Sequence, residues 1–165
     1  VGSEMCIRDR LGETSIETAK SIYASYPYAK SNLMNDDTQD TVYNCFGMDM
    51  PVPAGYEENE FGFLFAAPVG GAVCTIVINQ PGFIALGALQ VGDVSETALS
   101  LFGFPETPPP VSLRWILDNG AQLDYNWHGD DCFTFIYRLD GQKATAYVEA
   151  GIVHSLELTM EDALA

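Results

Sequence analysis

Two segments of the chain have the hydrophobic spacing of an amphipathic helix. In the first, the residues from Thr14 to Glu17 have the form of a capping box, with Thr14 as the N-cap. The apolar positions that follow at helical spacing are Ala19, Ile22, Tyr23 and Tyr26. This pattern predicts a helix that ends before Pro27.

The second helical segment repeats this form. Asp93 to Glu96 is the predicted cap, and the predicted apolar stripe is Val94, Ala98, Leu101 and Phe102. Gly103 is the predicted stop, with Pro105 just beyond it. Residues 17–23 align without gaps on residues 96–102, with four identities in seven positions, which indicates an internal repeat.

Alternating apolar and polar residues predict strands after each helix. After the first helix we expect a strand over 41–46 and a hairpin with arms 60–67 and 72–79, joined at Gly70-Gly71. After the second helix we expect five strands, over 111–117, 121–127, 133–137, 144–149 and 152–158. Asn119-Gly120, Asp140-Gly141 and Ala150-Gly151 are the turn signals between them.

Helices that precede strands, without alternating with them, favour an α+β fold. We predict two related helix-plus-antiparallel-sheet modules, one over 11–82 and one over 83–165. Each is small for independent stability, so we expect them to share a core or one continuous sheet.

The first ten residues fit nothing that follows. Residues 1–10 resemble the translation of a transposase-type sequencing adapter, and they are excluded from fold reasoning. We expect the remaining 155 residues (165 − 10) to be a metagenomic, bacterial fragment whose natural N-terminus is missing.

The chain is strongly acidic. It has 7 Lys and Arg against 23 Asp and Glu, a net charge of −16, and residues 1–10 hold two of each sign, so their removal leaves the charge unchanged. Scattered cations argue against nucleic acid and against an anionic membrane surface. No stretch approaches the ~20 apolar residues of a spanning helix. Two kinds of explanation fit the acidity: steering of a basic partner, or else solubility or adaptation to a saline habitat.

A combination of short motifs marks the second half of the chain. It consists of Val91-Gly92-Asp93, then Leu101-Phe102-Gly103-Phe104-Pro105, then Arg114-Trp115, and finally Gly151-Ile152-Val153-His154-Ser155-Leu156. Over residues 91–158 it resembles the helix-then-sheet module of small bacterial envelope proteins, namely outer-membrane assembly lipoproteins of the SmpA/OmlA type and tandem-module β-lactamase inhibitor proteins. The chain differs by an insertion over 32–59 and by having no visible lipidated cysteine, for which the missing N-terminus would be the place.

The resemblance implies a periplasmic or secreted protein that binds other proteins, is not an enzyme and needs no cofactor. It carries over no binding residue. From the residues themselves, Tyr125 and Trp127 are the expected anchors of a protein contact on the exposed sheet, provided that both are exposed.

A metal- or thiol-dependent enzyme is the alternative function. The candidate ligands are His128, Asp130, Asp131, Cys132 and His154, and a Cys132–His154 dyad is the candidate nucleophile pair. The spacing lacks the paired ligands of zinc motifs, so a polar turn between two strands is the competing interpretation. His154 is expected on the same strand face as Ile152, Leu156 and Leu158, partly buried.

Three cysteines remain once residues 1–10 are excluded: Cys45, Cys74 and Cys132. In a reducing compartment they would be core thiols. In the periplasm one pair would bridge and the third would pair elsewhere, and the connectivity stays open.

Overall fold

The computed structural model describes residues 11–23, 32–35, 38–48, 50–85, 88–104 and 109–161. Residues 1–10, Tyr26, Pro27 and Pro105, on which predictions were made above, lie outside these ranges. The chain forms two compact units, one of Asp9–Asn79 and one that includes Gln80–Ala165.

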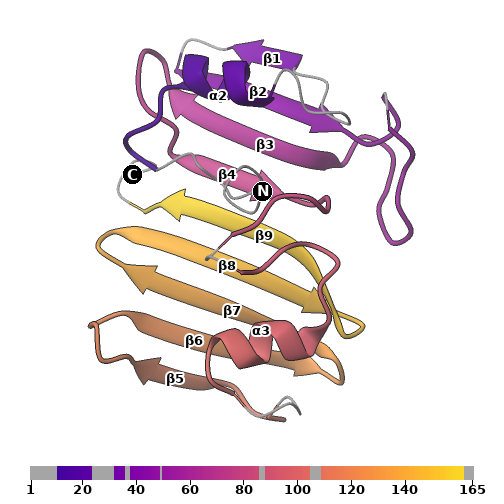
Figure 1. Cartoon of the computed structure of the whole chain (residues 1–165), viewed down its shortest axis with the longest axis vertical. Coiled ribbons are helices and arrows are strands. Elements are labelled where there is room, and N and C mark those ends of the chain that lie inside the picture. The colour runs from indigo at the N-terminus through magenta and orange to yellow at the C-terminus, as the bar shows by residue number, and fades with distance from the viewer. Residues whose placement is uncertain are drawn as a thin grey trace. The chain divides into compact units, whose positions relative to one another are not determined.

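The unit of Asp9–Asn79 is a short helix against an antiparallel sheet (Figure 1). The helix is α2 (Ile16–Tyr23), and the strands are β1 (Asn32–Asn35), β2 (Gln39–Cys45), β3 (Phe61–Pro68) and β4 (Thr75–Ile78). The strands pair in the order β1-β2-β3-β4. The core consists mainly of Ile16, Ala19, Val42, Phe46, Phe63, Phe65, Val73, Ile76 and Ile78. The sequence pattern predicted β2, β3 and β4 but not β1.

The predicted cap of α2 is wrong by one residue. Ser15, and not Thr14, accepts the hydrogen bond of the first turn, because the Thr18 N–H donates to Ser15 Oγ at 3.2 Å. The Thr14 carbonyl instead accepts the Val73 N–H at 2.7 Å. Thr14 therefore belongs to the segment that bonds to the chain before β4, and the helix begins after it.

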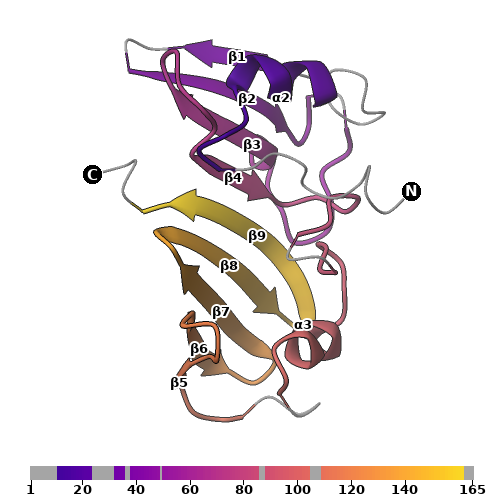
Figure 2. The ribbon, with the colours of Figure 1, turned by 60° about the vertical axis from the view of Figure 1, so that its left-hand side comes forward.

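The unit of Gln80–Ala165 is a meander of antiparallel strands with one helix on one face (Figures 1 and 2). The helix is α3 (Ser95–Leu101), and the strands are β5 (Leu113–Ile116), β6 (Gln122–Gly129), β7 (Cys132–Leu139), β8 (Gln142–Glu149) and β9 (Ile152–Met160). They lie in the order β9-β8-β7-β6-β5. All five were predicted, since each neighbouring pair is joined by a tight turn. At Asp140-Gly141 and Ala150-Gly151, φ is positive at both residues, as a two-residue hairpin turn requires.

The predicted cap of α3 is also wrong. The helix begins at Ser95 with Val94 as the N-cap, and no side chain bonds the free N–H groups of its first turn. Asp93 lies one residue too early, and its Oδ2 accepts the Gln90 N–H at 3.0 Å instead.

The predicted apolar stripe of α3 is rotated relative to the real one. Val94 and Leu101 are exposed, whereas Ala98 and Leu99 are fully buried. A helix turns about 100° per residue, so choosing Leu101 in place of Leu99 shifts the stripe away from the sheet. Phe102, at the C-cap, lies partly buried against the sheet.

Strands dominate the described part of the chain, which has nine strands against two helices of eight and seven residues. The fold combines helix and sheet as predicted, but it is β-dominated, and the expected description as two helix-plus-sheet modules understates this. Within the described ranges, neither helix is long and apolar enough to cross a membrane.

Candidate functional site

The edge strand of the meander, β5, is exposed along its whole length. Trp115 is 37% exposed and Ile116 is 69% exposed, and Leu113 is exposed as well. Natural proteins usually protect such an apolar edge strand with charges, prolines or a covering loop, because an unprotected edge can pair with another chain. Among its four residues only Arg114 is charged.

Two residues of β5 point their backbone groups away from the sheet. The Leu117 N–H donates to the Ala121 carbonyl at 2.8 Å, so these two residues form a hydrogen-bonded pair. Every second pair along the ladder is of the same kind, namely Trp115 with Leu123 and Leu113 with Tyr125. Hydrogen-bonded pairs alternate along an antiparallel ladder. The N–H and C=O groups of Arg114 and Ile116 therefore face outward, and no described residue bonds to them.

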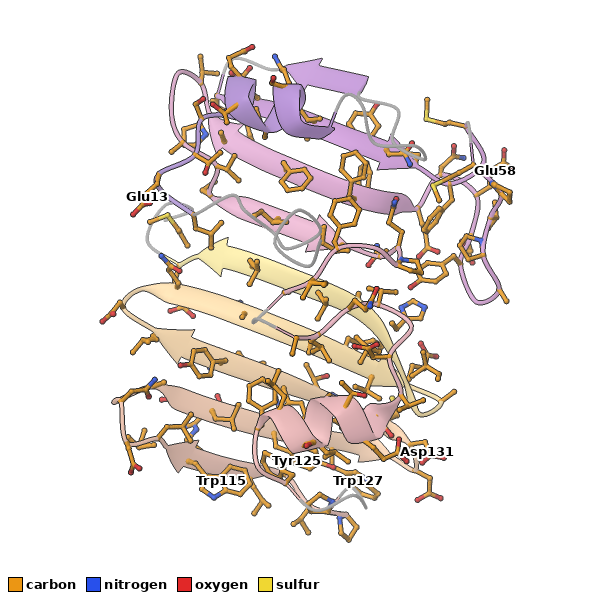
Figure 3. The ribbon with its side chains drawn as sticks, viewed as in Figure 1. Glu13, Glu58, Trp115, Tyr125, Trp127 and Asp131 are labelled. Carbon is orange, nitrogen blue, oxygen red and sulfur yellow. The ribbon has the colours of Figure 1, made fainter. Side chains whose placement is uncertain are left out.

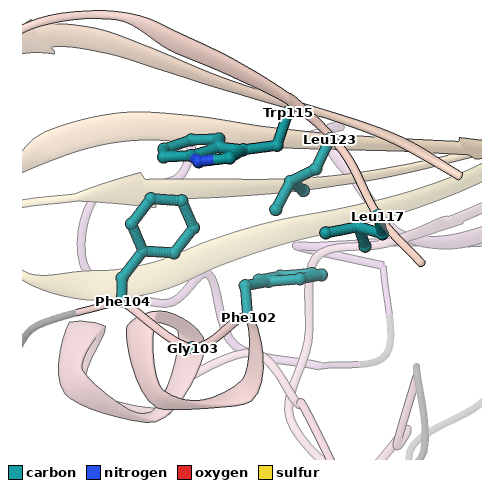
Figure 4. A pocket seen from close by; sticks show the side chains of 6 residues that line it. All are labelled: Phe102, Gly103, Phe104, Trp115, Leu117 and Leu123. Carbon is teal, nitrogen blue, oxygen red and sulfur yellow. The ribbon is translucent and has the colours of Figure 1, made fainter.

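An open apolar pocket of about 190 Å³ lies beside β5, between this strand and the end of α3 (Figure 4). Its walls are Phe102, Gly103, Phe104, Trp115, Leu117 and Leu123. Two of them, Trp115 and Leu117, belong to β5 or follow it directly, so the pocket adjoins the exposed edge. A pocket lined by aromatic and aliphatic carbon suits an apolar side chain.

Gly103 places Phe104 in the pocket wall. The Phe104 N–H donates to the Leu99 carbonyl at 2.8 Å and the Gly103 N–H to the Ser100 carbonyl at 3.1 Å, which is the Schellman pattern of a helix end. Gly103 has φ +79°, a left-handed conformation that glycine adopts without strain. The predicted stop is therefore confirmed, and it also turns the chain back so that Phe104 meets the sheet.

Aromatic packing holds the pocket in shape. The Phe104 and Trp115 rings meet edge to face with centroids 4.7 Å apart, and the Phe102 ring lies 4.6 Å from that of Phe135. Such pairs prefer these tilted and edge-on geometries. The pocket is thus lined by side chains that are already fixed by their neighbours.

Tyr125 belongs to this aromatic core and not to the surface. It is fully buried, its ring packs against Phe104 and Phe133, and its hydroxyl donates to the Pro109 carbonyl at 2.8 Å. Burial raises the pKa of its phenol. The expectation that Tyr125 anchors a partner is corrected on this ground, because a partner has no access to it.

Trp127 lies on the surface near the start of β5 (Figure 3). Its side chain is 36% exposed, and its backbone N–H donates to Ser112 Oγ at 3.0 Å. Its role as a binding anchor stays a prediction. We refer to Leu113, Trp115, Ile116 and Trp127, together with the pocket, as the edge surface.

An ion-pair network ties β5 to its neighbours on the face opposite the pocket. The buried Asp124 accepts hydrogen bonds from Arg114 Nε at 2.6 Å and Arg138 Nη1 at 2.7 Å. Arg138 Nε also bonds Glu161 at 2.8 Å. The hydrogen bond from Arg114 is the main reason that the pKa of Asp124 is lowered, and burial opposes it. The network holds the edge strand in place and neutralises the charge of Arg114.

The five candidate metal and thiol residues do not form a common ligand set in the described part of the chain, and two of them, His128 and Cys132, bond to other side chains. His128 Nε2 lies 3.0 Å from Thr134 Oγ1, and Cys132 Sγ lies 3.8 Å from the Tyr147 hydroxyl. Asp130 and Asp131 are exposed in the turn between β6 and β7. Nowhere in the described ranges do three or more His, Cys, Asp and Glu side chains form a group that could hold a metal ion.

His154 departs from the regular alternation that was expected of β9. The ladder between β8 and β9 shifts at Tyr147 and Val148, so Val153 is buried and Ile152 is exposed. The His154 ring meets the Tyr147 ring edge-on, with centroids 6.2 Å apart. Tyr147 thus lies between Cys132 and His154, and its hydrogen bond to Cys132 raises its pKa.

Cys45, Cys74 and Cys132 are free thiols in the structure. Cys45 and Cys74 are buried, and burial raises the pKa of the Cys45 thiol. Cys132 is partly exposed.

Sequence reasoning missed most of the edge surface. The sequence placed Trp115 in a predicted strand and Phe102 and Phe104 at the end of a predicted helix, and all three in the motif of the resemblance, but it indicated no binding role for them. The signal for the Arg114–Asp124 pair was present, because the two residues are equally far from Asn119 at the centre of the turn.

Comparison with known proteins gives no relative for this chain: no family model matches it, and neither a curated protein nor a solved structure does.

Proposed function

We propose that this chain is a non-catalytic, secreted or periplasmic domain that binds another protein through the edge surface. One observation carries the proposal: an exposed apolar edge strand, β5, adjoins a pocket whose aromatic walls are fixed by packing. An exposed apolar strand edge of this kind can pair with another chain.

The chemistry of the edge surface supports protein binding. Tryptophan is among the residues that contribute most binding energy at protein interfaces, and both tryptophans of the chain, Trp115 and Trp127, belong to this surface. Because Trp115 is already held by Phe104, little side-chain freedom would be lost on binding.

The secreted or periplasmic location is supported by the resemblance to modules of bacterial envelope proteins. The relationship between the two units is a further part of the proposal. We infer that they descend from one helix-plus-sheet module, since each has a short helix followed by antiparallel strands and the two helices align.

Site-specific photo-crosslinking tests the proposed function. A benzophenone amino acid in place of Ile116 is expected to form a covalent adduct with one protein from a bacterial envelope extract. The same probe in place of Val69, an exposed turn residue of the other unit, is the matched control. The adduct at Ile116 is expected to be lost in a Trp115→Leu background. Equal adducts at both positions, or an adduct that persists with Trp115→Leu, would contradict the proposal.

A further inference from the structure

We propose that the partner of the edge surface is a basic, extended segment of another protein, which adds to β5 as a further strand and places an apolar side chain in the pocket. This inference rests on the proposed function and names the class of partner that it requires.

Backbone pairing is the first reason. Arg114 and Ile116 each offer an outward N–H and C=O, so β5 presents two complete sites for the hydrogen bonds of a neighbouring strand. Strand addition at an exposed edge obtains its affinity from such main-chain bonds. A helix or a folded surface would leave these groups without partners.

The alternation of side chains is the second reason. Because Arg114 and Ile116 would form the hydrogen-bonded pairs with the added strand, Trp115 and Leu117 would face it in the intervening, closer pairs. Trp115 and Leu117 line the pocket, so partner residues opposite them project their side chains on the pocket side. Every second residue of the partner would thus be apolar.

Charge is the third reason. Asp118 lies exposed just after β5, and Asp130 and Asp131 lie exposed near its other end, where Figure 3 shows Asp131 beyond Trp127. The carboxylates of these three residues bond to no described residue. Since Arg114 is neutralised by Asp124, the edge has unopposed negative charge at both ends.

These negative charges favour a partner with basic residues. The edge from Ser112 to Asp118 spans seven residues of the chain, or roughly 23 Å at about 3.3 Å per residue. A segment of about this length with lysine or arginine at both ends would match it. A second copy of the chain fits poorly, because each copy has a net charge of −16.

A synthetic peptide of about nine residues, long enough to cover this span, provides the probe: Lys-Lys-Thr-Phe-Thr-Val-Thr-Lys-Lys with a fluorescent label. Its Phe and Val project on one side, toward the pocket, and its threonine amides face β5. We expect fluorescence anisotropy to show saturable binding. Replacing all lysines by glutamate, or Phe by alanine, is expected to weaken binding about tenfold or more.

N-methylation of the peptide amides distinguishes strand addition from other binding modes. Methylation of the threonine amides removes the donors that would meet the carbonyls of Arg114 and Ile116, and is expected to weaken binding about tenfold or more. Methylation of the Phe and Val amides, which point away from β5, is the matched control and is expected to change the affinity by less than about threefold. These peptides leave the fold of the protein untouched.

On the protein side, Ile116→Pro removes one outward N–H without breaking the β5–β6 ladder, and it is expected to weaken binding. Val52→Pro in the other unit, at an exposed residue whose N–H bonds to no described residue, is the control and is not expected to weaken binding. Equal effects of the two methylation patterns would overturn strand addition. If Trp115→Leu then still abolished the photo-adduct, the proposed function would stand.

Two results would overturn the proposal that the partner is basic. One is failure of the lysine peptide to bind. The other is self-association of the protein that Ile116→Lys abolishes, because the partner would then be a second copy of the chain.

Discussion

Replacing each tryptophan by alanine tests whether the pocket is held by packing. Trp115 and Trp127 are 37% and 36% exposed, so each substitution removes nearly the same buried area. A buried area of about 150 Å² at about 25 cal/mol/Å², reduced for the compactness of the unfolded chain, corresponds to roughly 2–3 kcal/mol in either case.

The two substitutions differ in one contact. The Trp115 ring packs edge to face on Phe104 at 4.7 Å, whereas Trp127 makes no aromatic ring contact with a described residue. An aromatic pair adds about 0.5–1.5 kcal/mol beyond the area that it buries. Trp115→Ala is therefore expected to reduce the free energy of unfolding by about 1 kcal/mol more than Trp127→Ala.

Urea unfolding followed by tryptophan fluorescence measures this difference. Both tryptophans of the chain lie in the unit of Gln80–Ala165, so in each variant the remaining indole reports the unfolding of that unit. If Trp115→Ala costs no more than Trp127→Ala, then Phe104 does not hold Trp115, and the pocket is not the preformed site on which the proposed function depends.

Three further predictions concern other contacts of the structure. Because its two arginine partners lower the pKa of Asp124, its charge stabilises the fold above the ordinary carboxyl range, and this stability is lost as the pH falls through the lowered pKa. Asp124→Asn is thus expected to cost about 1–3 kcal/mol at pH 7 and progressively less below about pH 4, as measured by urea unfolding across pH. Tyr125→Phe, which removes the hydrogen bond to the Pro109 carbonyl, is expected to cost about 1 kcal/mol in the same assay, and an unchanged stability would contradict this bond. Brief treatment of the native protein with iodoacetamide, followed by peptide mass mapping, is expected to modify Cys132 before the two buried cysteines, and the reverse order would contradict their burial.

Turn chemistry made the five-stranded meander predictable. Gly at the second position of the Asp140-Gly141 and Ala150-Gly151 turns allows the positive φ that two-residue hairpins need, and the strands between these turns alternate in polarity. Once such turns are placed, the register follows beside each turn, up to the shifts at Tyr147 and Val148 and at Trp127. The pairing of Arg114 with Asp124 could have been predicted in this way.

Burial within one strand face was not predictable in the same way. Alternation places Tyr125 and Trp127 on the same side of β6, but it does not say which of them a distant segment covers. The chain after α3 returns over Tyr125 through Phe104, and leaves Trp127 exposed. That outcome depends on the path of the chain after Gly103, which local periodicity does not encode.

Hydrogen exchange at two amides tests the central claim most directly. In the complex with the lysine-flanked peptide, the N–H groups of Arg114 and Ile116 are predicted to become protected from exchange with solvent, because they would donate to the added strand. The N–H of Trp115, which already faces β6, is predicted to change little. Unchanged exchange at Arg114 and Ile116 in the presence of saturating peptide would contradict the claim that β5 is the binding edge.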